Sequence, residues 1–392
     1  MAIQHGIRAG QLGLSDIILA LNAGSSSLKF GLFAPEEQSS RLNEIAAASW
    51  KVENDPAAID RVLEWVDGRI GVHHLSAVGH RIVHGGSEFV DPVEIDDNTL
   101  CRLEALAPLA PLHQPAGLAP VQRIRALRPQ LRQFACFDTA FHRTIVPPAS
   151  RYALPRRFES EGIRRYGFHG LSYQSIAEQL RLEGAAEREG RPSRIIVAHL
   201  GNGASLCAML GLVSIDTTMG FSVLDGLVMG TRAGALDPGI LLYLLRAKHM
   251  STDQLEHLLY RESGLLGVSG ISSDVAELLA SNAVEAADAL ELFTFQVAKQ
   301  ATGLAMSLGG LDRIVFTGGI GEHAPSVRAM IVKRLYWLGA DLDTDANVSG
   351  QGTISSDTSA ILLEWRTTQE ERAIALNTLA CARRQEPLGL LA

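Results

Sequence analysis

The sequence predicts an α/β fold made of two related domains, and three observations support this expectation. Segments that alternate like β-strands take turns with segments whose apolar residues recur at helical spacing. The chain has 392 residues, which is more than one hydrophobic core usually serves. A strand–turn–strand pattern, LNAGSSSLKF at 21–30, is echoed by HLGNGASLCAM at 199–209. The echo indicates a duplicated domain; two unrelated hairpins with Gly- and Ser-rich turns are the alternative.

The first half of the chain opens with two strands around a turn of small residues. A helix follows over PAAIDRVLEWVDGRIG, where four apolar residues share one face: Ile59, Val62, Leu63 and Val66. LSAVGHRIV and LRQFACF have the composition of strands, and AGLAPVQRIRAL between them is typical of a helix. We expect a first domain over 16–150, preceded by a loose extension and joined by a C-terminal helix over 368–392.

The second half repeats this alternation and gives a second domain over 151–367. RIIVAH and AILLEW are expected strands, and PGILLYLLRA, TDQLEHLLY and the segment 283–308 are expected helices. DRIVFTGGIGEHAPSVRAMIVKRLYWL predicts a strand, a glycine turn and a helix.

Composition excludes several classes of function. The net charge is −8, with no block of like charges, which argues against nucleic acid as a partner. The four cysteines are widely spaced without a CxxC pair, which is typical of thiols in a reducing compartment. No apolar run approaches the ~18 residues of a membrane helix, and the N-terminus lacks the apolar core of a signal peptide. We therefore expect a cytoplasmic protein that binds no membrane.

The turn after Asn22 raises a question of chemistry. A Walker-type phosphate loop opens a helix, whereas here Leu28, Phe30 and Leu32 continue as a strand. A turn without side-chain bulk lets backbone N–H groups approach an anion, so two such hairpins can hold a polyphosphate. Ser25, Ser27 and Lys29 supply further donors.

Eight motifs follow one another along most of the chain: NAGSSSLKF, GHRIVHGG, PLHQP, FDTAFH, RRYGFHG, HLGNGAS, DTTMGFSVLDGLVMGTRAGALDPG and FTGGIGEHA. Together, from about Ile17 to Asn377, they resemble the acetate kinase family. The resemblance implies two duplicated ribonuclease-H-like domains of the actin type, flanking a nucleotide cleft. It also implies a homodimer that transfers a phosphoryl group reversibly between ATP and acetate, with Mg²⁺, by direct in-line attack.

Four residues resemble the catalytic groups of that family: Arg81, Asp138, His169 and Arg232. The arginines would clamp the acceptor carboxylate and the phosphoryl group, because a guanidinium pairs well with such oxygens; structural salt bridges are the alternative. His169 would stabilise the moving phosphoryl group. Asp138 would orient metal-bound water and an arginine, since an ionised acceptor needs no general base, or else cap the following turn.

The resemblance makes Asn22 and Glu370 metal ligands. A turn-forming role for Asn22 and a favourable interaction of Glu370 with the helix dipole are the alternatives, while Thr368 and Glu371 have the spacing of a capping box. The implied nucleotide contacts are Lys29, His199, Gly201, Asn202, Gly203, Asp274, Gly318, Gly319, Ile320, Gly321 and His323. An N-cap role for Asp274 can hold beside this one. His113 resembles a further histidine of the cleft.

Two departures from the family concern the nucleotide: Ala276 stands where arginine is usual, and His323 where asparagine is usual. They leave the nucleoside preference open. The implied pocket for the acetate methyl group consists of Val83, Leu112, Phe168 and Val223, the last in place of a usual proline. One methylene is worth only ~1–3 kcal/mol in such a pocket. A propionate or butyrate kinase is therefore an alternative, and an ATP-driven clamp of the same superfamily is a second.

Overall fold

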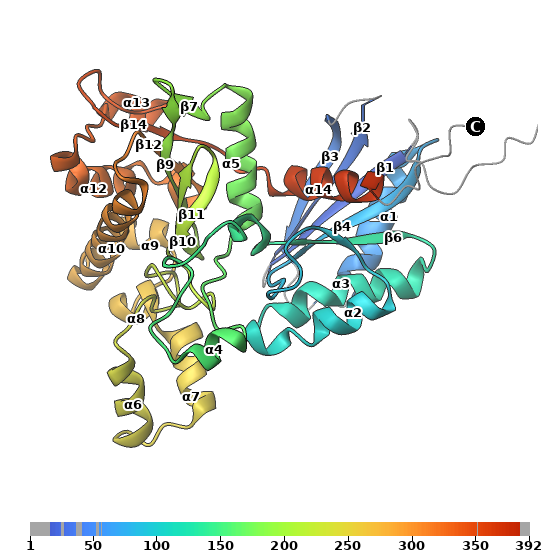
Figure 1. The fold of residues 1–392 in the computed structure, drawn as a ribbon, viewed down its shortest axis with the longest axis horizontal. Coiled ribbons are helices and arrows are strands. Elements are labelled where there is room, and N and C mark those ends of the chain that lie inside the picture. The colour runs from blue at the N-terminus through green and yellow to red at the C-terminus, as the bar shows by residue number, and fades with distance from the viewer. Residues whose placement is uncertain are drawn as a thin grey trace, which may run out of the picture. The chain divides into compact units, whose positions relative to one another are not determined.

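The computed structural model of the chain describes residues 16–24, 27–36, 41–51, 55, 57–350 and 352–384 (Figure 1). These residues form two compact units. The first contains the described residues up to Ala140 and those from Gln369 onward, and the second is Phe141–Thr368. The sequence places the division after residue 150, whereas in the structure residues 141–150 belong to the second unit. Ser25 and the expected N-terminal extension before Asp16 lie outside the described residues.

The first unit is built on a mixed sheet of six strands in the order β3-β2-β1-β4-β6-β5. The strands are β1 (Asp16–Ala23), β2 (Ser27–Pro35), β3 (Leu42–Lys51), β4 (His74–Ile82), β5 (Val93–Glu94) and β6 (Arg132–Phe137). Its helices are α1 (Ala58–Ile70), α2 (Asp97–Glu104), α3 (Gln114–Leu127) and α14 (Glu370–Arg384), besides a 3₁₀ turn at Ala107–Leu109.

The second unit has its own six-stranded sheet, in the order β11-β10-β9-β12-β14-β13. The strands are β9 (Arg194–Leu200), β10 (Ala204–Leu210), β11 (Val213–Thr217), β12 (Arg313–Thr317), β13 (Gly352–Thr353) and β14 (Leu362–Trp365), and β7 (Glu187–Arg188) pairs with β8 (Arg191–Pro192). The helices are α4 (Arg156–Ser160), α5 (Gly170–Leu182), α6 (Pro238–Arg246), α7 (Thr252–His257), α8 (Gly264–Ser269), α9 (Val275–Ala280), α10 (Val284–Leu308), α11 (Gly318–His323), α12 (Pro325–Leu335) and α13 (Thr344–Ser349).

The two sheets have the same topology, which confirms the predicted duplication. In each, the first two strands form an antiparallel hairpin, β1 with β2 and β9 with β10. In each, the first strand then runs parallel to the next two strands in the sheet, β4 and β6 or β12 and β14. The carboxyl ends of three parallel strands therefore share one edge of each sheet, which is where ligands bind in α/β proteins.

The core of the first unit follows from the alternation of its strands. The expected helical face of α1 is confirmed, because Ile59, Val62, Leu63 and Val66 are buried against β1, β2 and β4. Phe30 of β2 lies in the same cluster. Gly79 faces the opposite side of the sheet, where a Cβ would lie 2.7 Å from a methyl carbon of Ile374. Helix α14 can approach β4 closely for this reason.

Two predicted elements differ from the structure. GGIGEH does not form an open turn but the short helix α11, directly after β12. The helix predicted over TDQLEHLLY continues beyond α7 as a π-helical turn at Leu258–Glu262.

The long helix expected over 283–308 is α10, which packs on the second sheet along β9, β10 and β11. Among the described residues, no helix is long and apolar enough to span a membrane.

Candidate active site

A charged cluster lies at the carboxyl edge of the first sheet. Asn22 near the end of β1, Arg81 near the end of β4 and Asp138 just after β6 come together because these strands are parallel. The Nε and Nη2 atoms of Arg81 donate to Oδ2 of Asp138 at 2.9 and 2.6 Å, and Nη1 donates to Oδ1 of Asn22 at 3.3 Å. The guanidinium therefore bridges two of the expected site residues.

Helix α14 completes this cluster from the opposite end of the chain. Glu370 and Glu371 occupy its first turn, where the helix dipole favours negative charge. Nδ2 of Asn22 donates to Oε2 of Glu370 at 2.8 Å and to Oε1 of Glu371 at 3.0 Å. Sequence reasoning assigned Glu371 to a capping box and missed this contact, because nothing in the local pattern links a residue to a strand some 350 positions earlier.

The charges of the cluster determine its electrostatics. Burial by itself lowers the pKa of Arg81, but Asp138, Glu370 and Glu371 outweigh this effect and hold the pKa above its ordinary value. Asp138 is only 1% exposed, so its carboxylate depends on Arg81 for compensation. Arg81 therefore keeps its positive charge in a cluster that contains three carboxyl groups and one guanidinium.

The donor set of this cluster suits a hard divalent cation. Glu370 and Glu371 offer carboxylate oxygens, and Asn22 has an amide oxygen that accepts from Arg81; oxygens of these kinds are the ligands that Mg²⁺ prefers. Among the described residues, no group of three or more His, Cys, Asp or Glu is placed to hold a metal alone. Such a set fits a cation held by one or two protein groups together with substrate phosphates.

In the second unit, two histidines lie beside the turn between β9 and β10. The ring of His169 stacks on that of His199 with 4.3 Å between centroids and 22° between planes. Nδ1 of His169 lies 2.8 Å from Oγ of Ser205, and Nδ1 of His199 lies 2.8 Å from Oγ of Ser172. The two hydroxyls fix both rings, and sequence reasoning missed them because Ser hydroxyls carry no distinctive pattern.

His169 holds an unusual backbone conformation, with φ +57° at the start of α5. The left-handed region is uncommon for a residue with a Cβ and often marks a functional position. His142 supports this segment: its ring lies against Gly167, and its Nε2 is 3.0 Å from the carbonyl of Phe168. Burial lowers the pKa of His142 to about 4, so this ring is neutral.

Arg232 faces the same turn. A Cβ on Gly203 would lie 2.7 Å from Nη2 of Arg232 and 3.1 Å from Nε2 of His169. Nη1 of Arg232 is anchored by the carbonyl of Val223 at 2.8 Å. A guanidinium and an imidazole therefore approach one stretch of bare backbone, which is a favourable arrangement for an anion.

A cavity of about 430 Å³ is bordered by the same turn. It is lined by Gly201, Asn202, Ser273, Asp274, Val275, Ala276, Leu279, Gly319, Ile320, His323 and Ala324. Six expected nucleotide contacts are thereby brought together: Gly201, Asn202, Asp274, Gly319, Ile320 and His323. Its size is within the range of small-molecule sites, and its walls are mostly apolar.

Residues 17–376 match the model of the acetokinase family. A curated acetate kinase of Rhodopseudomonas palustris is 46% identical over 390 residues, covering 92% of this chain and 97% of the relative, and one from Methylocella silvestris is 43% identical. The chain belongs to the acetokinase family. Its membership confirms the resemblance that the eight motifs gave.

Solved structures of similar proteins agree with this assignment. A propionate kinase from Francisella tularensis aligns with a TM-score of 0.83 at 34% identity, covering 93% of this chain and 99% of the other. An acetate kinase from Porphyromonas gingivalis aligns with a TM-score of 0.80 at 32% identity, with the same coverage. The predicted fold class, two duplicated α/β domains of the actin type, is confirmed.

Two of the glycines expected to contact the nucleotide lie away from the cavity. Gly318 and Gly321 do not line it: a Cβ at Gly318 would meet the Leu200 carbonyl at 2.7 Å, and Gly321 faces Phe316. These glycines let α11 pack tightly on β9 and β12. Asp274 does cap α9, since its side chain accepts from the N–H of Ala276 at 2.8 Å.

The remaining expected residues divide between the units. Lys29 is an exposed residue of β2, directly opposite Asn22 in the hairpin register. Of the four residues expected to surround the methyl group, Val83, Phe168 and Val223 are buried, whereas Leu112 is 37% exposed. His113 precedes α3. Their shared pocket stays a prediction, since Val83 and Leu112 belong to one unit and Phe168 and Val223 to the other.

Proposed function

We propose that this chain is an acetate kinase, which transfers the γ-phosphoryl group of ATP reversibly to acetate and forms acetyl phosphate and ADP. The proposal rests on membership of the acetokinase family and on the names of its curated relatives. The observation that carries it is the β9–β10 turn, which borders the cavity through Gly201 and Asn202 and faces Arg232 and His169 at Gly203. A nucleoside in the cavity would have its phosphates at that turn.

The residues of the second unit would do most of the binding. Asp274 at the cavity wall offers a carboxylate to the ribose hydroxyls, and Gly319 and Ile320 present a surface on which a flat base can lie. Arg232 and His169 would donate to the oxygens of the phosphoryl group as charge spreads over them. Preorganised donors of this kind contribute ~10³–10⁵ in rate to phosphoryl transfer.

The residues of the first unit would act on charge and orientation. Acetate is ionised near neutral pH and attacks without a general base, so Asp138 is assigned to the orientation of Arg81 rather than to proton transfer. Arg81 would neutralise the acceptor carboxylate. Asn22 and Glu370 would hold Mg²⁺, with Glu371 beside them. When bound, the cation screens the phosphates and orients them for in-line attack.

The acyl chain length is the finer question. The name of the Francisella relative favours propionate as a second acceptor, and the valine at 223 rather than a proline leaves the size of the pocket open. Because one methylene is worth ~1–3 kcal/mol, we expect measurable turnover of propionate below that of acetate. An ATP-driven clamp is no longer a useful alternative for a member of a kinase family.

The experiment is a trapping assay. The chain is incubated with ATP, MgCl₂ and acetate, propionate or butyrate, and hydroxylamine converts any acyl phosphate to a coloured hydroxamate. We expect acetate to give the highest kcat/KM, and a control without carboxylate to give no colour. Colour equal to that control with all three acids would overturn the proposal, whereas a higher kcat/KM for propionate would correct only the substrate.

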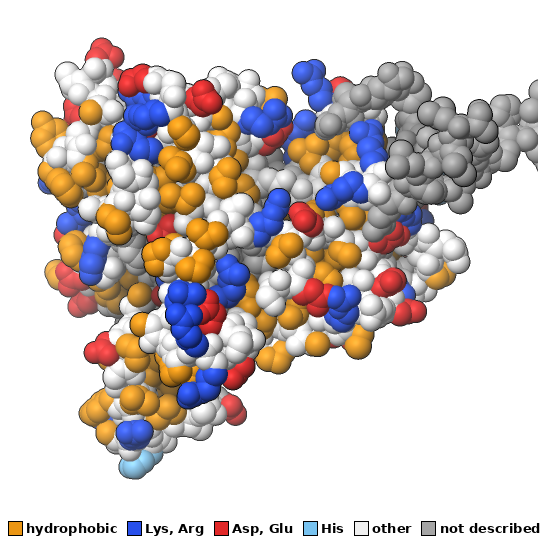
Figure 2. Space-filling view, viewed as in Figure 1, with side chains coloured by type: hydrophobic (Ala, Val, Ile, Leu, Met, Phe, Trp, Pro, Cys, Tyr) orange, Lys and Arg blue, Asp and Glu red, His pale blue; other side chains and the backbone are white. Residues whose placement is uncertain are grey.

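Two finer expectations join this proposal. The protein would be a cytoplasmic homodimer. Helix α6 supports the expectation of a homodimer, because none of its residues is buried and Ile240, Leu242 and Tyr243 are exposed. Figure 2 shows hydrophobic side chains gathered over this helix. Light scattering after size exclusion measures the mass directly, and a monomer at micromolar concentration would contradict this expectation.

A further inference from the structure

The position of Arg232 depends on the segment that leads to it. Its Nη1 is held by the carbonyl of Val223, which belongs to an extended loop between β11 and α6. This loop has no regular secondary structure over residues 218–237. A backbone carbonyl fixes a guanidinium only as well as the carbonyl is itself fixed. The question is what holds residues 217–225 in place.

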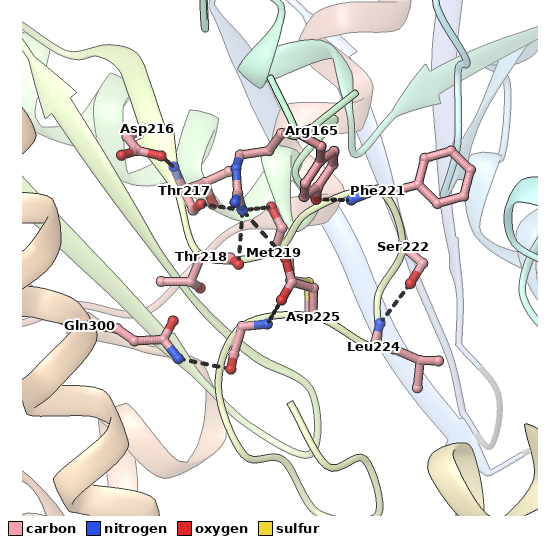
Figure 3. A network of polar contacts seen from close by, with 12 residues as sticks. Arg165, Asp216, Thr217, Thr218, Met219, Phe221, Ser222, Leu224, Asp225 and Gln300 are labelled. Carbon is pink, nitrogen blue, oxygen red and sulfur yellow. Dashed lines mark hydrogen bonds and ion pairs between the residues drawn. The ribbon is translucent and has the colours of Figure 1, made fainter. Parts of the chain in front are cut away.

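Arg165, from the segment before α5, binds three successive carbonyls at the start of this loop (Figure 3). Its Nη1 donates to Thr217 at 3.0 Å, Thr218 at 3.1 Å and Met219 at 3.1 Å. The same side chain donates through Nε to the carbonyl of Ala149 at 3.2 Å. Arg165 therefore connects the loop to the segment before α4 through backbone carbonyls.

The acidic partner of Arg165 extends the contact further along the loop. Oδ2 of Asp225 lies 3.6 Å from Nη1 of Arg165, and Oδ1 accepts from the N–H of Gly226 at 2.8 Å. On the far side, Gln300 of α10 donates to the carbonyl of Gly226 at 2.8 Å. The loop is thus fixed both before and after Val223, and Figure 3 shows these groups turned toward one another.

Arg165 also belongs to the segment that carries His169. The N–H groups of Tyr166 and Gly167 both donate to the carbonyl of Gly220, at 3.0 and 3.3 Å. Oη of Tyr152, over whose ring the Arg165 guanidinium lies, accepts from the N–H of Phe221 at 2.8 Å. The segment with His169 and the loop with Val223 are therefore joined side by side, with Arg165 at their junction.

We propose that Arg165 is a positioning residue, which joins the segment of His169 to the loop of Arg232 so that both side chains face the β9–β10 turn together. It acts on Arg232 through the loop that carries Val223, and on His169 through the backbone of Tyr166 and Gly167. This inference rests on the proposed function only where turnover is measured. Because one guanidinium donates to several carbonyls, its removal leaves all of them without this donor at once. We therefore expect the loop to loosen cooperatively.

The first test measures the loop without any reaction. Hydrogen–deuterium exchange of the amides in 217–235 is compared between the native chain, Arg165→Gln and Arg151→Gln. Arg151 is a matched control, because it is an exposed arginine of the same unit that pairs with Glu159. We expect at least 10-fold faster exchange in 217–225 for Arg165→Gln and no change for the control. Unchanged exchange in Arg165→Gln overturns the inference, whatever the activity.

The second test separates positioning from general stability. Arg165→Gln should lower kcat for acetyl phosphate formation at least 20-fold, while the calorimetric Kd for ADP changes less than 3-fold, because the cavity does not contain the loop. Arg165→Lys should have a kcat within about 5-fold of that of the native chain, since an ammonium has three donors for three carbonyls. A parallel loss of kcat and of ADP affinity would indicate a merely structural role and contradict positioning.

A double-mutant cycle with Arg232 decides the route. If Arg165 acts in part through Arg232, the loss in Arg165→Gln/Arg232→Ala is smaller than the product of the two single losses. Independent roles would multiply the two losses in full and contradict this route. Tyr152→Phe, which removes the acceptor for Phe221, is the milder variant if Arg165→Gln does not fold, and should lower kcat 3- to 10-fold. No hydroxamate from the native chain would reject the proposed function, but the exchange result would still decide this inference.

Discussion

The two units share one scaffold and use it for different chemistry. The residue after the third parallel strand donates its N–H to the neighbouring strand in both: Asp138 to Ile82 at 3.1 Å, and Arg366 to Phe316 at 2.9 Å. At this position the first unit has a buried acid paired with Arg81, and the second has an arginine paired with Glu183 and Glu364. The duplicated fold thus fixes where side chains emerge, whereas the residue types decide what each edge binds.

The same contrast separates the two hairpins. Near the first turn, Asn22 gathers carboxylates and an arginine, which is a set of groups for a cation and its anionic partners. Near the second, glycines 201 and 203 leave bare backbone between a cavity and two basic side chains. We infer that the first unit supplies charge control and that the second holds the nucleotide. Four experiments can break or sharpen this division of labour.

The largest effect is expected from removing one arginine in each unit. Arg81→Ala and Arg232→Ala should each lower kcat at least ~10²-fold, because each removes a cation aimed at charge that develops in the transition state. Thermal unfolding and kcat are measured together. Arg123→Ala, which removes an exposed partner of Asp60, is the control and should leave both unchanged. If either active-site variant kept near-native turnover, that unit would have no part in transfer.

A methyl group in the second turn should be nearly as harmful. Gly203→Ala places a Cβ within 2.7 Å of Nη2 of Arg232 and 3.1 Å of Nε2 of His169. Both contacts involve the ends of side chains, so we expect the fold to survive and kcat to fall ~10- to 50-fold. Gly303→Ala, in α10 with open space around it, is the matched control and should lose no activity. Full activity of Gly203→Ala would show that the two basic groups have no joint role.

Acidification should weaken both units, because each contains a buried neutral histidine. Burial lowers the pKa of His80 and of His142 to about 4. Between pH 6.5 and pH 4 these histidines are protonated in the unfolded chain but not in the folded chain. Folding stability is therefore lost as the pH falls through this range. We expect about 1–2 kcal/mol per histidine between pH 7 and pH 5.

Urea midpoints at the two pH values measure this loss. His80→Gln keeps a donor for Oε1 of Gln133, to which His80 is bound at 2.8 Å, and should make the pH dependence shallower. A variant as pH-sensitive as the native chain would exclude His80 as a source of the effect.

The smallest effect separates two roles of Asp274. Serine caps helices about as well as aspartate, so Asp274→Ser should keep α9 and the unfolding temperature while removing the carboxylate from the cavity. We expect KM for ATP to rise about 5-fold, which is about 1 kcal/mol. KM for acetate should not change. Asp343→Ser, at the N-cap of α13, is the control and should leave both constants alone. An unchanged KM for ATP would leave Asp274 as a cap only.

Much of this fold could be predicted from local patterns. Strand β2 is identified by the alternation of Leu28, Phe30 and Leu32, and α1 by the shared face of Ile59 and Val66. Both the strand period and the helix period can be recognised within a few consecutive residues. The GGIG segment could not be predicted in this way. Glycine favours turns by its own propensity, but here the glycines are needed so that α11 can approach β9, and this requirement comes from the packing.

The candidate site shows the same limit. Motifs identified most cavity residues, yet they missed Leu279, which contributes an ordinary apolar side chain. Ser205 and Ser172 also escaped notice, since their role is to orient His169 and His199 from elements dozens of residues away. Glu371 was assigned to its own helix because its partner Asn22 is at the other end of the chain. Local sequence identifies the reacting groups better than it identifies their supports.

The first unit is discontinuous in sequence, since α14 joins it from beyond Thr368. During synthesis on the ribosome, the second unit has emerged in full before Glu370 and Glu371 leave the exit tunnel. Domains tend to fold as they emerge, so the nucleotide-binding half can mature first. The charged edge around Asn22 receives Glu370 and Glu371 last. A nascent or prematurely terminated polypeptide therefore lacks two of the groups expected to coordinate the cation, and we expect phosphoryl transfer to begin only when translation of the last helix is finished.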